Sequence, residues 1–277
     1  MNLKSHLLST AVLALSLGFA PITHADELAT KGREIFKKHQ RAVLTVQVVV
    51  KMKLSVPGMG GQDNETKLDV TGTVVDPSGL TVLALSSIEP GNMLENLMAG
   101  MTDEDMNFKM ETELTDVKML LDDGTELPAE VVLRDKDLDL AFARPKTKPA
   151  SPMTAVDLSK ASTAQVLDQV ITLNRLGQAA GRAYAVSVER ITAVVQKPRL
   201  FYIPDSTMTS TAQGSPGFTP DGNLLGIFVM RSVRAKSGGM GMFSMRPEGL
   251  TSIILPAADV LKAAKQVPEA KGDSKAK

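Results

Sequence analysis

The chain has 277 residues, with 31 basic and 31 acidic side chains, so its formal net charge is +0 at neutral pH. This balance excludes the strongly basic surface by which nucleic-acid-binding proteins hold phosphate groups, and we expect no nucleic-acid partner. The sequence has no cysteine, which excludes a disulfide framework. With 8 Phe, 2 Tyr and no Trp, wide stacking platforms for bases or sugars are not expected.

The first 25 residues have the features of a secretory signal peptide. Lys4 supplies a basic start, an apolar run follows over Leu7–Ala20, and Thr23-His24-Ala25 offers small residues at a cleavage site. The apolar run is shorter than a membrane-spanning helix requires. We therefore expect cleavage after Ala25 and a periplasmic or secreted mature protein without a membrane span.

The first half of the mature chain is expected to hold one short helix followed by strands. Residues 26–40 place Leu28, Ile35 and Phe36 on one face and lysines on the other, which predicts an amphipathic helix. Valine-rich runs between glycine, proline and aspartate turns then predict strands and hairpins. The predicted strands are Ala42–Met52, Leu68–Asp76, Leu80–Ser86, Val117–Leu121, Ala129–Leu133 and Asp139–Arg144, and Gly58–Glu65 is expected to be a polar loop.

The second half repeats this pattern after a segment rich in proline, serine and lysine, which indicates a linker over residues 149–163. Short strands on both sides of a linker predict two packed β-barrels, over 41–148 and 164–267. Pro256–Val267 predicts a closing helix with proline near its first position, and 268–277 a disordered tail. The predicted strands of this half are Gln169–Leu173, Ala183–Val195, Arg199–Ile203, Leu224–Val229 and Thr251–Leu255.

The segment 211–227 (TAQGSPGFTPDGNLLGI) carries two tight turns ahead of an apolar strand. Glycines so close together mark a backbone that takes positive φ or passes close to another group. The segment resembles the nucleophile loop of trypsin-like serine peptidases of the HtrA type, G-N-S-G-G-P-L followed by a hairpin and D-G-x-V-I-G-I. When Asp221-Gly222 is aligned to that pattern, Gly214 takes the first glycine, Ser215 takes the second, and Gln213 takes the place of the nucleophilic serine.

Three further segments resemble the same family, in the same order along the chain. Gly72–Gly79 (GTVVDPSG) is similar to the hairpin ahead of the catalytic histidine, whose place is taken by Ser86. Val117–Arg144 ends in a run similar to D-x-x-x-D-L-A, in which the triad acid corresponds to Asp139. Thr251–Pro256 (TSIILP) resembles the strand beside the specificity pocket. The resemblance implies an all-β protein of two packed six-stranded antiparallel barrels, with short N- and C-terminal helices. No PDZ domain is expected, because only a short tail follows the last predicted helix.

The resemblance also implies a catalytic triad, of which two members are missing. A serine peptidase needs an imidazole within hydrogen-bond reach of a hydroxyl, oriented by a carboxylate. His6 and His24 are expected to leave with the signal peptide, and His39, the third histidine, precedes the first strand. Because loss of the nucleophile or the base of such a triad lowers turnover by about 10⁶, we expect a catalytically degenerate member of the family.

The residues that remain at the former catalytic positions have other roles available to them. Asp139 is expected to cap or bond a turn rather than orient a base, because a retained fold does not imply retained chemistry. Ser215 could replace the nucleophile with a lysine as its base, although it more simply fills a glycine position in a turn. Gln213 is expected to bond the loop or fill the former site. The amides of Gln213 and Gly214 could form an oxyanion-type nest.

Methionines are concentrated in two insertions between the predicted strands. The favoured role is local cover of the barrel ends, because Met93, Leu97 and Met101 recur at helical spacing. An adaptable apolar surface for a partner comes second. Cu(I) binding through thioethers comes third, because the spacings are irregular and no His or Cys assists. The methionines concerned are Met93, Met98, Met101, Met106, Met110, Met240, Met242 and Met245.

These observations favour a binding protein and leave an enzyme as the alternative. The first interpretation is an exported serine peptidase homologue that has lost its catalytic histidine and serine and acts as a peptide-binding or protein-binding pseudoprotease or scaffold. The alternative is an active serine endopeptidase with an unconventional nucleophile, working in periplasmic protein quality control. We expect a peptide or protein partner, no cofactor and no metal, and the oligomeric state is left open.

Overall fold

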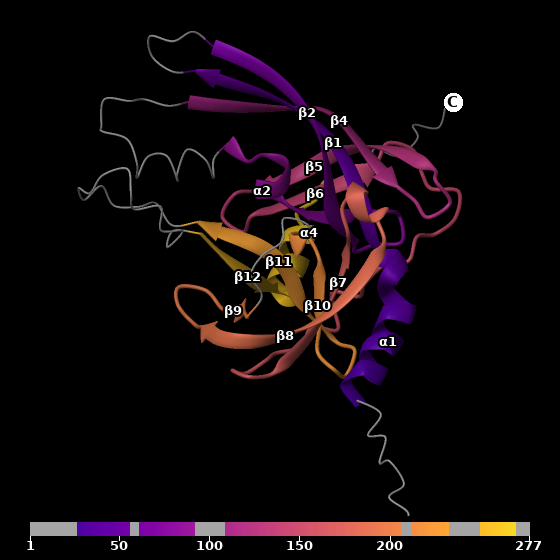
Figure 1. Ribbon diagram of the computed structural model, residues 1–277, viewed down its shortest axis with the longest axis vertical. Helices are drawn as coiled ribbons and strands as arrows, with labels where there is room; N and C mark the ends of the chain where they lie inside the picture. The colour runs from indigo at the N-terminus through magenta and orange to yellow at the C-terminus, as the bar shows by residue number, and fades with distance from the viewer. Residues whose placement is uncertain (1–26, 56–60, 92–108, 206–211, 233–249, 270–277) are drawn as a thin grey trace, which may run out of the picture.

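The computed structural model describes residues 27–55, 61–91, 109–205, 212–232 and 250–269. Within these ranges the chain forms two closed antiparallel barrels of six strands each (Figure 1). The predicted fold class is therefore confirmed. The expected signal peptide, the tail from residue 270 and, apart from Met110, the methionines of the two insertions lie outside the described residues.

The first barrel follows two short helical segments, α1 (Glu27–His39) and the 3-10 turn η1 (Gln40–Ala42). Its strands close in the order β1-β2-β3-β6-β5-β4, and all neighbouring pairs are antiparallel. The strands are β1 (Val43–Ser55), β2 (Gly61–Val74), β3 (Thr81–Ala84), β4 (Lys109–Leu120), β5 (Glu126–Asp135) and β6 (Leu140–Pro145).

The first part of strand β1, from Val43 to Val48, is buried on both of its faces. Val46, Val48 and Val50 are fully buried in the core of the first barrel. Thr45 and Gln47, on the other face, are only 2% and 7% exposed, and β1 contacts β7 of the second barrel. A strand covered on both sides needs little alternation of apolar and polar residues, which explains why the continuous run VLTVQVVV marks this strand so clearly.

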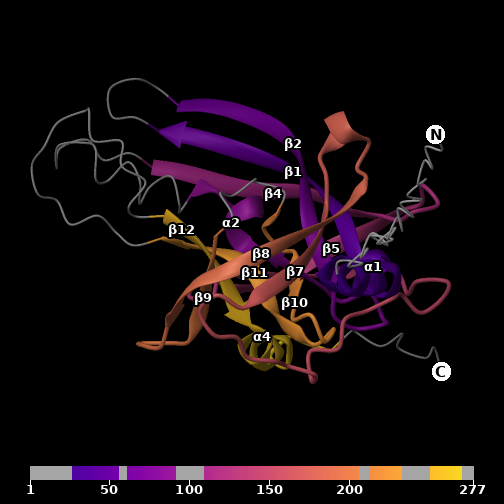
Figure 2. The same ribbon diagram turned by 60° about the horizontal axis from the view of Figure 1, so that its bottom comes forward.

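Strands β1, β2 and β4 extend well beyond the rest of the barrel, toward the upper left of Figures 1 and 2. The expected polar loop over Gly58–Glu65 is wrong in part, because β2 already begins at Gly61. β4 likewise begins at Lys109, earlier than predicted. The polar residues of β2 are held by pairing with β1, where Lys51 lies opposite Glu65. Such cross-strand partners of opposite charge stabilise a sheet without any apolar pattern.

The second barrel closes in the order β10-β11-β12-β9-β8-β7. Its interior holds a compact set of buried side chains, including Ile191, Tyr202, Leu225, Phe228 and Ile254. The helix α4 (Ala257–Ala264) follows directly on the last strand. The strands are β7 (Gln169–Arg175), β8 (Tyr184–Val195), β9 (Phe201–Pro204), β10 (Pro216–Phe218), β11 (Leu224–Ser232) and β12 (Leu250–Pro256), with the 3-10 turn η2 (Gln178–Ala180) between β7 and β8.

A further apolar cluster joins the two barrels. The segment between β6 and β7 contributes to it and is tied to both barrels, because Val156 N–H donates to Val74 O at 2.9 Å and Ser162 N–H donates to Leu224 O at 2.9 Å. The relative position of the barrels is thus set by a continuous core. Its buried members include Ile35 of α1, Val82, Leu140 and Phe142 of the first barrel, Val156 and Leu158 of the connecting segment, Leu173, Phe218, Ile227 and Leu255 of the second barrel, and Val260 of α4.

Candidate functional site

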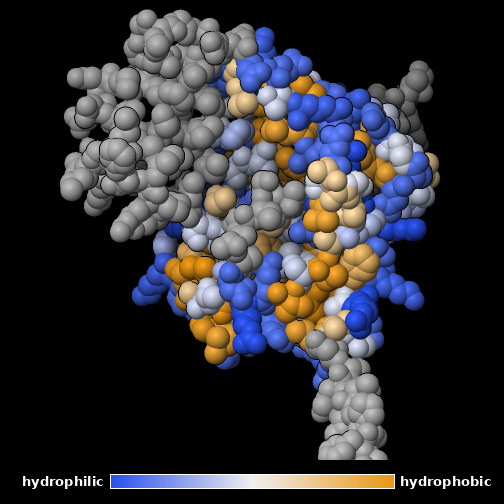
Figure 3. Space-filling view, in the orientation of Figure 1, coloured by the Kyte–Doolittle hydropathy of each residue, from blue (hydrophilic) through white to orange (hydrophobic). Residues whose placement is uncertain are grey.

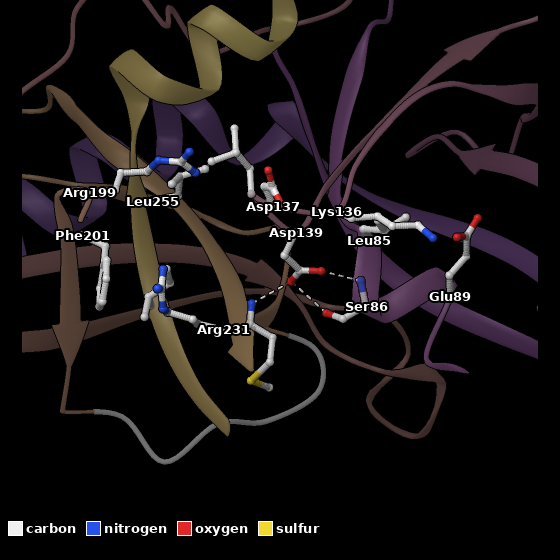
Figure 4. Close-up of a pocket in the computed structure, with 13 residues that line it drawn as sticks. Leu85, Ser86, Glu89, Lys136, Asp137, Asp139, Arg199, Phe201, Arg231 and Leu255 are labelled. Atoms are coloured by element: carbon white, nitrogen blue, oxygen red, sulfur yellow. Dashed lines mark hydrogen bonds between the residues drawn. The ribbon is translucent and has the colours of Figure 1, made fainter. Parts of the chain in front are cut away.

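A cavity of about 400 Å³ opens at the junction of the barrels. The first barrel contributes the short helix α2 (Leu85–Ile88) and the turn that precedes β6. The second contributes residues of β9, β11 and β12, so that the walls come from segments far apart in the sequence (Figure 4). The predicted positions Ser86 and Asp139 both line this cavity, whereas Gln213, Gly214 and Ser215 are not among its lining residues.

The carboxylate of Asp139 accepts three hydrogen bonds (Figure 4). Its Oδ1 accepts the Ser86 N–H at 2.7 Å. Its Oδ2 accepts the Ser86 hydroxyl and the Met230 N–H, each at 2.8 Å. The two residues at the expected histidine and acid positions therefore bond to each other, and Met230 of β11 ties the pair to the second barrel.

Asp139 also organises the start of α2. Its carbonyl accepts the Leu85 N–H at 2.9 Å, so both of its polar groups bond the first turn of the helix, whose amide donors have no partner within the helix. The sequence-based strand Leu80–Ser86 is accordingly corrected, because β3 ends at Ala84 and Ser86 lies in α2. Asp139 itself has φ of 55°, a left-handed conformation that aspartate tolerates better than most residues.

Partial burial raises the pKa of the Asp139 carboxyl above its ordinary value, because the charged form loses hydration. The hydrogen bonds from Met230 and Ser86 act in the opposite direction and do not cancel this effect. The oxygens of this carboxylate accept hydrogen bonds from groups of the protein itself. It orients a serine hydroxyl and a helical turn, and no imidazole lies beside it within the described residues.

The loop that resembles a nucleophile loop packs against the first barrel. Gly214 has φ of +83°, and a Cβ at this position would lie 2.2 Å from the carbonyl oxygen of Thr71, so only glycine fits. The Gly214 carbonyl accepts the Thr73 hydroxyl at 2.7 Å. Its N–H donates to Phe228 O at 2.8 Å. The Gly214 amide, expected to contribute to an oxyanion-type nest with Gln213, therefore bonds within the protein instead.

Ser215 is completely buried, with 0% of its surface exposed. Its N–H donates to Ala212 O at 3.1 Å and its carbonyl accepts the Phe228 N–H at 2.9 Å, which fixes the backbone of the turn. Within the described part of the chain its hydroxyl has no hydrogen-bond partner, and so no lysine base. Gln213 beside it is also buried, at 4% exposure. The geometry gives neither residue access to the cavity.

His39, the only histidine among the described residues, lies away from the cavity. It ends α1, and its ring stacks on Phe218 of β10 with centroids 4.9 Å apart and an interplanar angle of 24°. Burial, assisted by the charge of Lys38, lowers its pKa to about 4. The imidazole is therefore neutral at pH 7 and is part of the packing of α1 on the second barrel.

The two walls of the cavity differ in charge and in aromatic content. On the first-barrel wall, Glu89 pairs with Arg134, with Nε and Oε1 2.5 Å apart. On the second-barrel wall, the Arg231 guanidinium lies over the Phe201 ring, 4.9 Å from its centroid. Arg199 lines the same wall (Figure 4). The described lining offers no imidazole for proton transfer.

Residues 70–227 match the sequence family described as the trypsin-like peptidase domain. The chain belongs to this family. Among solved structures it is similar to the MamO protease domain from Magnetospirillum magneticum in its apo form, with 16% identity and a TM-score of 0.47. The similarity covers 82% of this chain and 97% of that one. No curated protein matches the sequence.

Sequence reasoning placed Ser86 and Asp139 but missed most of this trypsin-like peptidase cavity. Arg199, Phe201, Met230 and Arg231 line it as well, and no family motif marks them. Ile253 and Leu255, which also line it, lie in the segment that resembles the strand beside the specificity pocket. The arginines carry no local signal, because what makes them notable is the strand order that brings β9 and β11 together around β12. In the described ranges, no helix is long and apolar enough to cross a membrane.

Proposed function

We propose that the protein is exported and acts as a pseudoprotease, a trypsin-like peptidase homologue that binds peptides or proteins without cleaving them. The observation that carries this proposal is the hydrogen bonding of the Asp139 carboxylate, which accepts both the N–H and the hydroxyl of Ser86. A serine hydroxyl is no general base at neutral pH, so this pair cannot remove the proton from a nucleophile. Loss of both base and nucleophile leaves the fold available for binding alone.

The burial of Ser215 supports the same proposal. A substitute nucleophile must approach a substrate carbonyl to about 3 Å, and a side chain with 0% exposure does not reach the cavity without a rearrangement of its turn. Both backbone hydrogen bonds of Ser215 oppose such a rearrangement. The alternative of an active endopeptidase would therefore require another nucleophile or another conformation.

An edge of strand β11 offers a way to hold an extended peptide. β10 pairs with β11 only up to Ile227, and the next groups on that edge are used by Ser215, Gly214 and Asp139. Because hydrogen-bonding direction alternates along a strand, the Met230 carbonyl and the backbone groups of Ser232 face the same edge, and no described strand pairs with them. An extended peptide could add there as a strand, with side chains reaching the adjoining cavity.

The proposal is tested with the purified mature chain, casein as an unfolded substrate, and a fluorophosphonate probe for activated serines. We expect no cleavage and no labelling, together with saturable binding of fluorescein-labelled casein measured by anisotropy. An active trypsin-like enzyme serves as the positive control for both reagents. Cleavage and labelling that disappear in Ser215→Ala or Ser86→Ala would overturn the pseudoprotease proposal and identify the nucleophile.

Export is tested separately by expressing the full chain in a Gram-negative host. We expect the protein in the periplasmic fraction, with Asp26 as its first residue by N-terminal sequencing. A chain that stays in the cytoplasm with its first 25 residues intact would contradict the export part of the proposal and leave the binding part untouched.

A further inference from the structure

The second-barrel wall of the cavity carries two arginines that form no ion pair with a carboxylate of the described residues. Arg199 precedes β9 and Arg231 lies near the end of β11, and both line the cavity together with Phe201. Within the described residues, no ion pair joins either guanidinium to an acidic side chain. Figure 4 shows both side chains on the same side as Phe201, across the cavity from Asp139 and Ser86.

The acidic groups of the opposite wall form no ion pair with these arginines among the described residues. Asp139 directs its carboxylate to Ser86 and Met230, and Glu89 is paired with Arg134. Asp137 is exposed and follows Lys136, also exposed, in the same turn, so these two adjacent charges offset each other. The described lining still carries one net positive charge, because Lys136, Arg199 and Arg231 exceed Asp137 and Asp139 by one once Glu89 is paired with Arg134.

One of the arginines is also held in place. The Arg231 guanidinium lies 4.9 Å from the centroid of the Phe201 ring, a contact that favours a flat orientation over the aromatic face. A guanidinium held in this way loses less side-chain freedom when it binds a carboxylate, and its donors match the two oxygens of that group. Phe201 is only 6% exposed, so its ring is held in place beneath the guanidinium.

We propose that Arg199 and Arg231 make this cavity selective for extended peptide segments that carry aspartate or glutamate side chains. The proposal rests on the proposed peptide-binding function and specifies its ligand. Arg231 belongs to β11, which lines the cavity and has an edge beyond Ile227 that no described strand pairs with, so a peptide added along that edge brings its side chains close to the guanidinium. Charge complementarity with an otherwise unpaired arginine pair selects acidic residues over neutral ones of equal size.

The test compares two short fluorescein-labelled peptides of valine and threonine, one with glutamates at alternate positions and one with glutamine in their place. Anisotropy titrations with the mature chain are expected to give binding about tenfold tighter for the glutamate peptide, which corresponds to about 1.4 kcal/mol. High salt is expected to reduce this ratio, because the cavity is open to solvent. Arg199→Gln with Arg231→Gln is expected to abolish the ratio.

Arg33→Gln, a change at an exposed arginine of α1 outside the cavity, is the matched control and should retain the preference. Urea unfolding shows whether each variant keeps the native fold. Equal affinity of the two peptides for the unaltered protein would overturn the acidic selectivity while leaving peptide binding intact, as would a preference that survives in the double arginine variant. Absence of binding by either peptide and by casein would overturn the proposed function together with this inference.

Discussion

The barrel junction has two charged sides, and among the described residues only one of them has ion pairs between the barrels. On the side of α1, carboxylates of the first barrel meet arginines of the second: Arg182 Nε lies 2.6 Å from Asp69 Oδ2, and Arg175 Nη1 lies 3.6 Å from Asp122 Oδ1. On the side of α2, Arg199 and Arg231 line an open cavity. In Figure 1, α1 lies to the right of the junction and α2 to the left.

The neutralised side is a network rather than a set of isolated pairs. Asp122 also accepts the Tyr184 hydroxyl and lies 3.4 Å from Arg41 Nε, while the Arg175 guanidinium lies 3.9 Å from the centroid of the Tyr184 ring. Charges with several partners lose little extra freedom for each contact, whereas isolated surface pairs contribute almost nothing. The comparison shows that ion pairs join the barrels on one side, whereas on the other side our proposal assigns the arginines to a ligand.

The largest expected effect comes from the residue that joins the barrels between these two sides. Gly214→Ala would force a Cβ within 2.2 Å of Thr71 O at a φ of +83°. We expect a loss of about 3 kcal/mol or more in the free energy of unfolding, measured by urea titration. Gly177→Ala, where a Cβ meets nothing within 4 Å, is the control and should change stability little. A similar small effect at both glycines would contradict the described packing of this loop.

Removal of Asp139 is expected to weaken the open side. Asp139→Ala leaves the amides of Ser86 and Met230 without their acceptor, which costs about 2–3 kcal/mol. The raised pKa of this carboxyl adds a pH dependence. The part of the free energy of unfolding that this raised pKa supplies is complete at pH values below the ordinary aspartate pKa, near 3.9. It is lost as the pH rises through the pKa of the folded state.

Asp139→Asn isolates that pH dependence, since the amide does not titrate. In urea titrations between pH 3 and 7, the stability of the unaltered protein relative to Asp139→Asn should be greatest at the acid end and decline toward neutrality. A relative stability that grows with pH would mean that the hydrogen bonds from Ser86 and Met230 outweigh burial.

On the neutralised side, His39 should give the opposite pH response. Its pKa is lowered to about 4 by burial and by Lys38. The stability that neutral His39 supplies is therefore present above the ordinary histidine pKa of 6.5 and is lost as the pH falls toward 4. We expect a loss of about 1–2 kcal/mol over this window, given its partial exposure. His39→Phe keeps a ring against Phe218 and should remove this part of the acid sensitivity.

The smallest effects should separate the two sides most directly. A double-mutant cycle with Asp69→Asn and Arg182→Gln is expected to give a coupling energy of about 1 kcal/mol, because both side chains are partly buried, at 16% and 28% exposure. Arg231→Gln, on the open side, should leave the unfolding midpoint nearly unchanged. Equal losses of stability in the Arg182 and Arg231 variants would contradict the proposal that the first arginine joins the barrels and the second binds a ligand.

The fold could be predicted from the sequence largely because strands buried on two faces have continuous apolar runs that are easily recognised. The valine-rich run from Val43 to Val50 and the DLAFAR strand are examples, and their order matched a known family. The polar start of β2 at Gly61 could not be predicted, because it is held by pairing with β1 rather than by burial of apolar side chains.

The candidate site was predictable only where a motif marked it. Ser86 and Asp139 stood at family positions and do contact each other. The helical turn at Ser86 depends on capping by a residue 53 positions away, and the Met230 contact spans 91 positions. Long-range bonds of this kind leave no periodic trace in the sequence, which is also why Arg199 and Arg231 were not recognised before the strands were placed.

The core shared by the barrels has a consequence for how the protein loses its structure. It draws buried side chains from α1, both barrels, the connecting segment and α4, so each half, taken alone, would expose a broad apolar face to water. Units that depend on each other in this way melt together rather than in sequence. The molecule should therefore absorb heat in one cooperative transition, and a break in the connecting segment should weaken the whole fold instead of releasing two intact barrels.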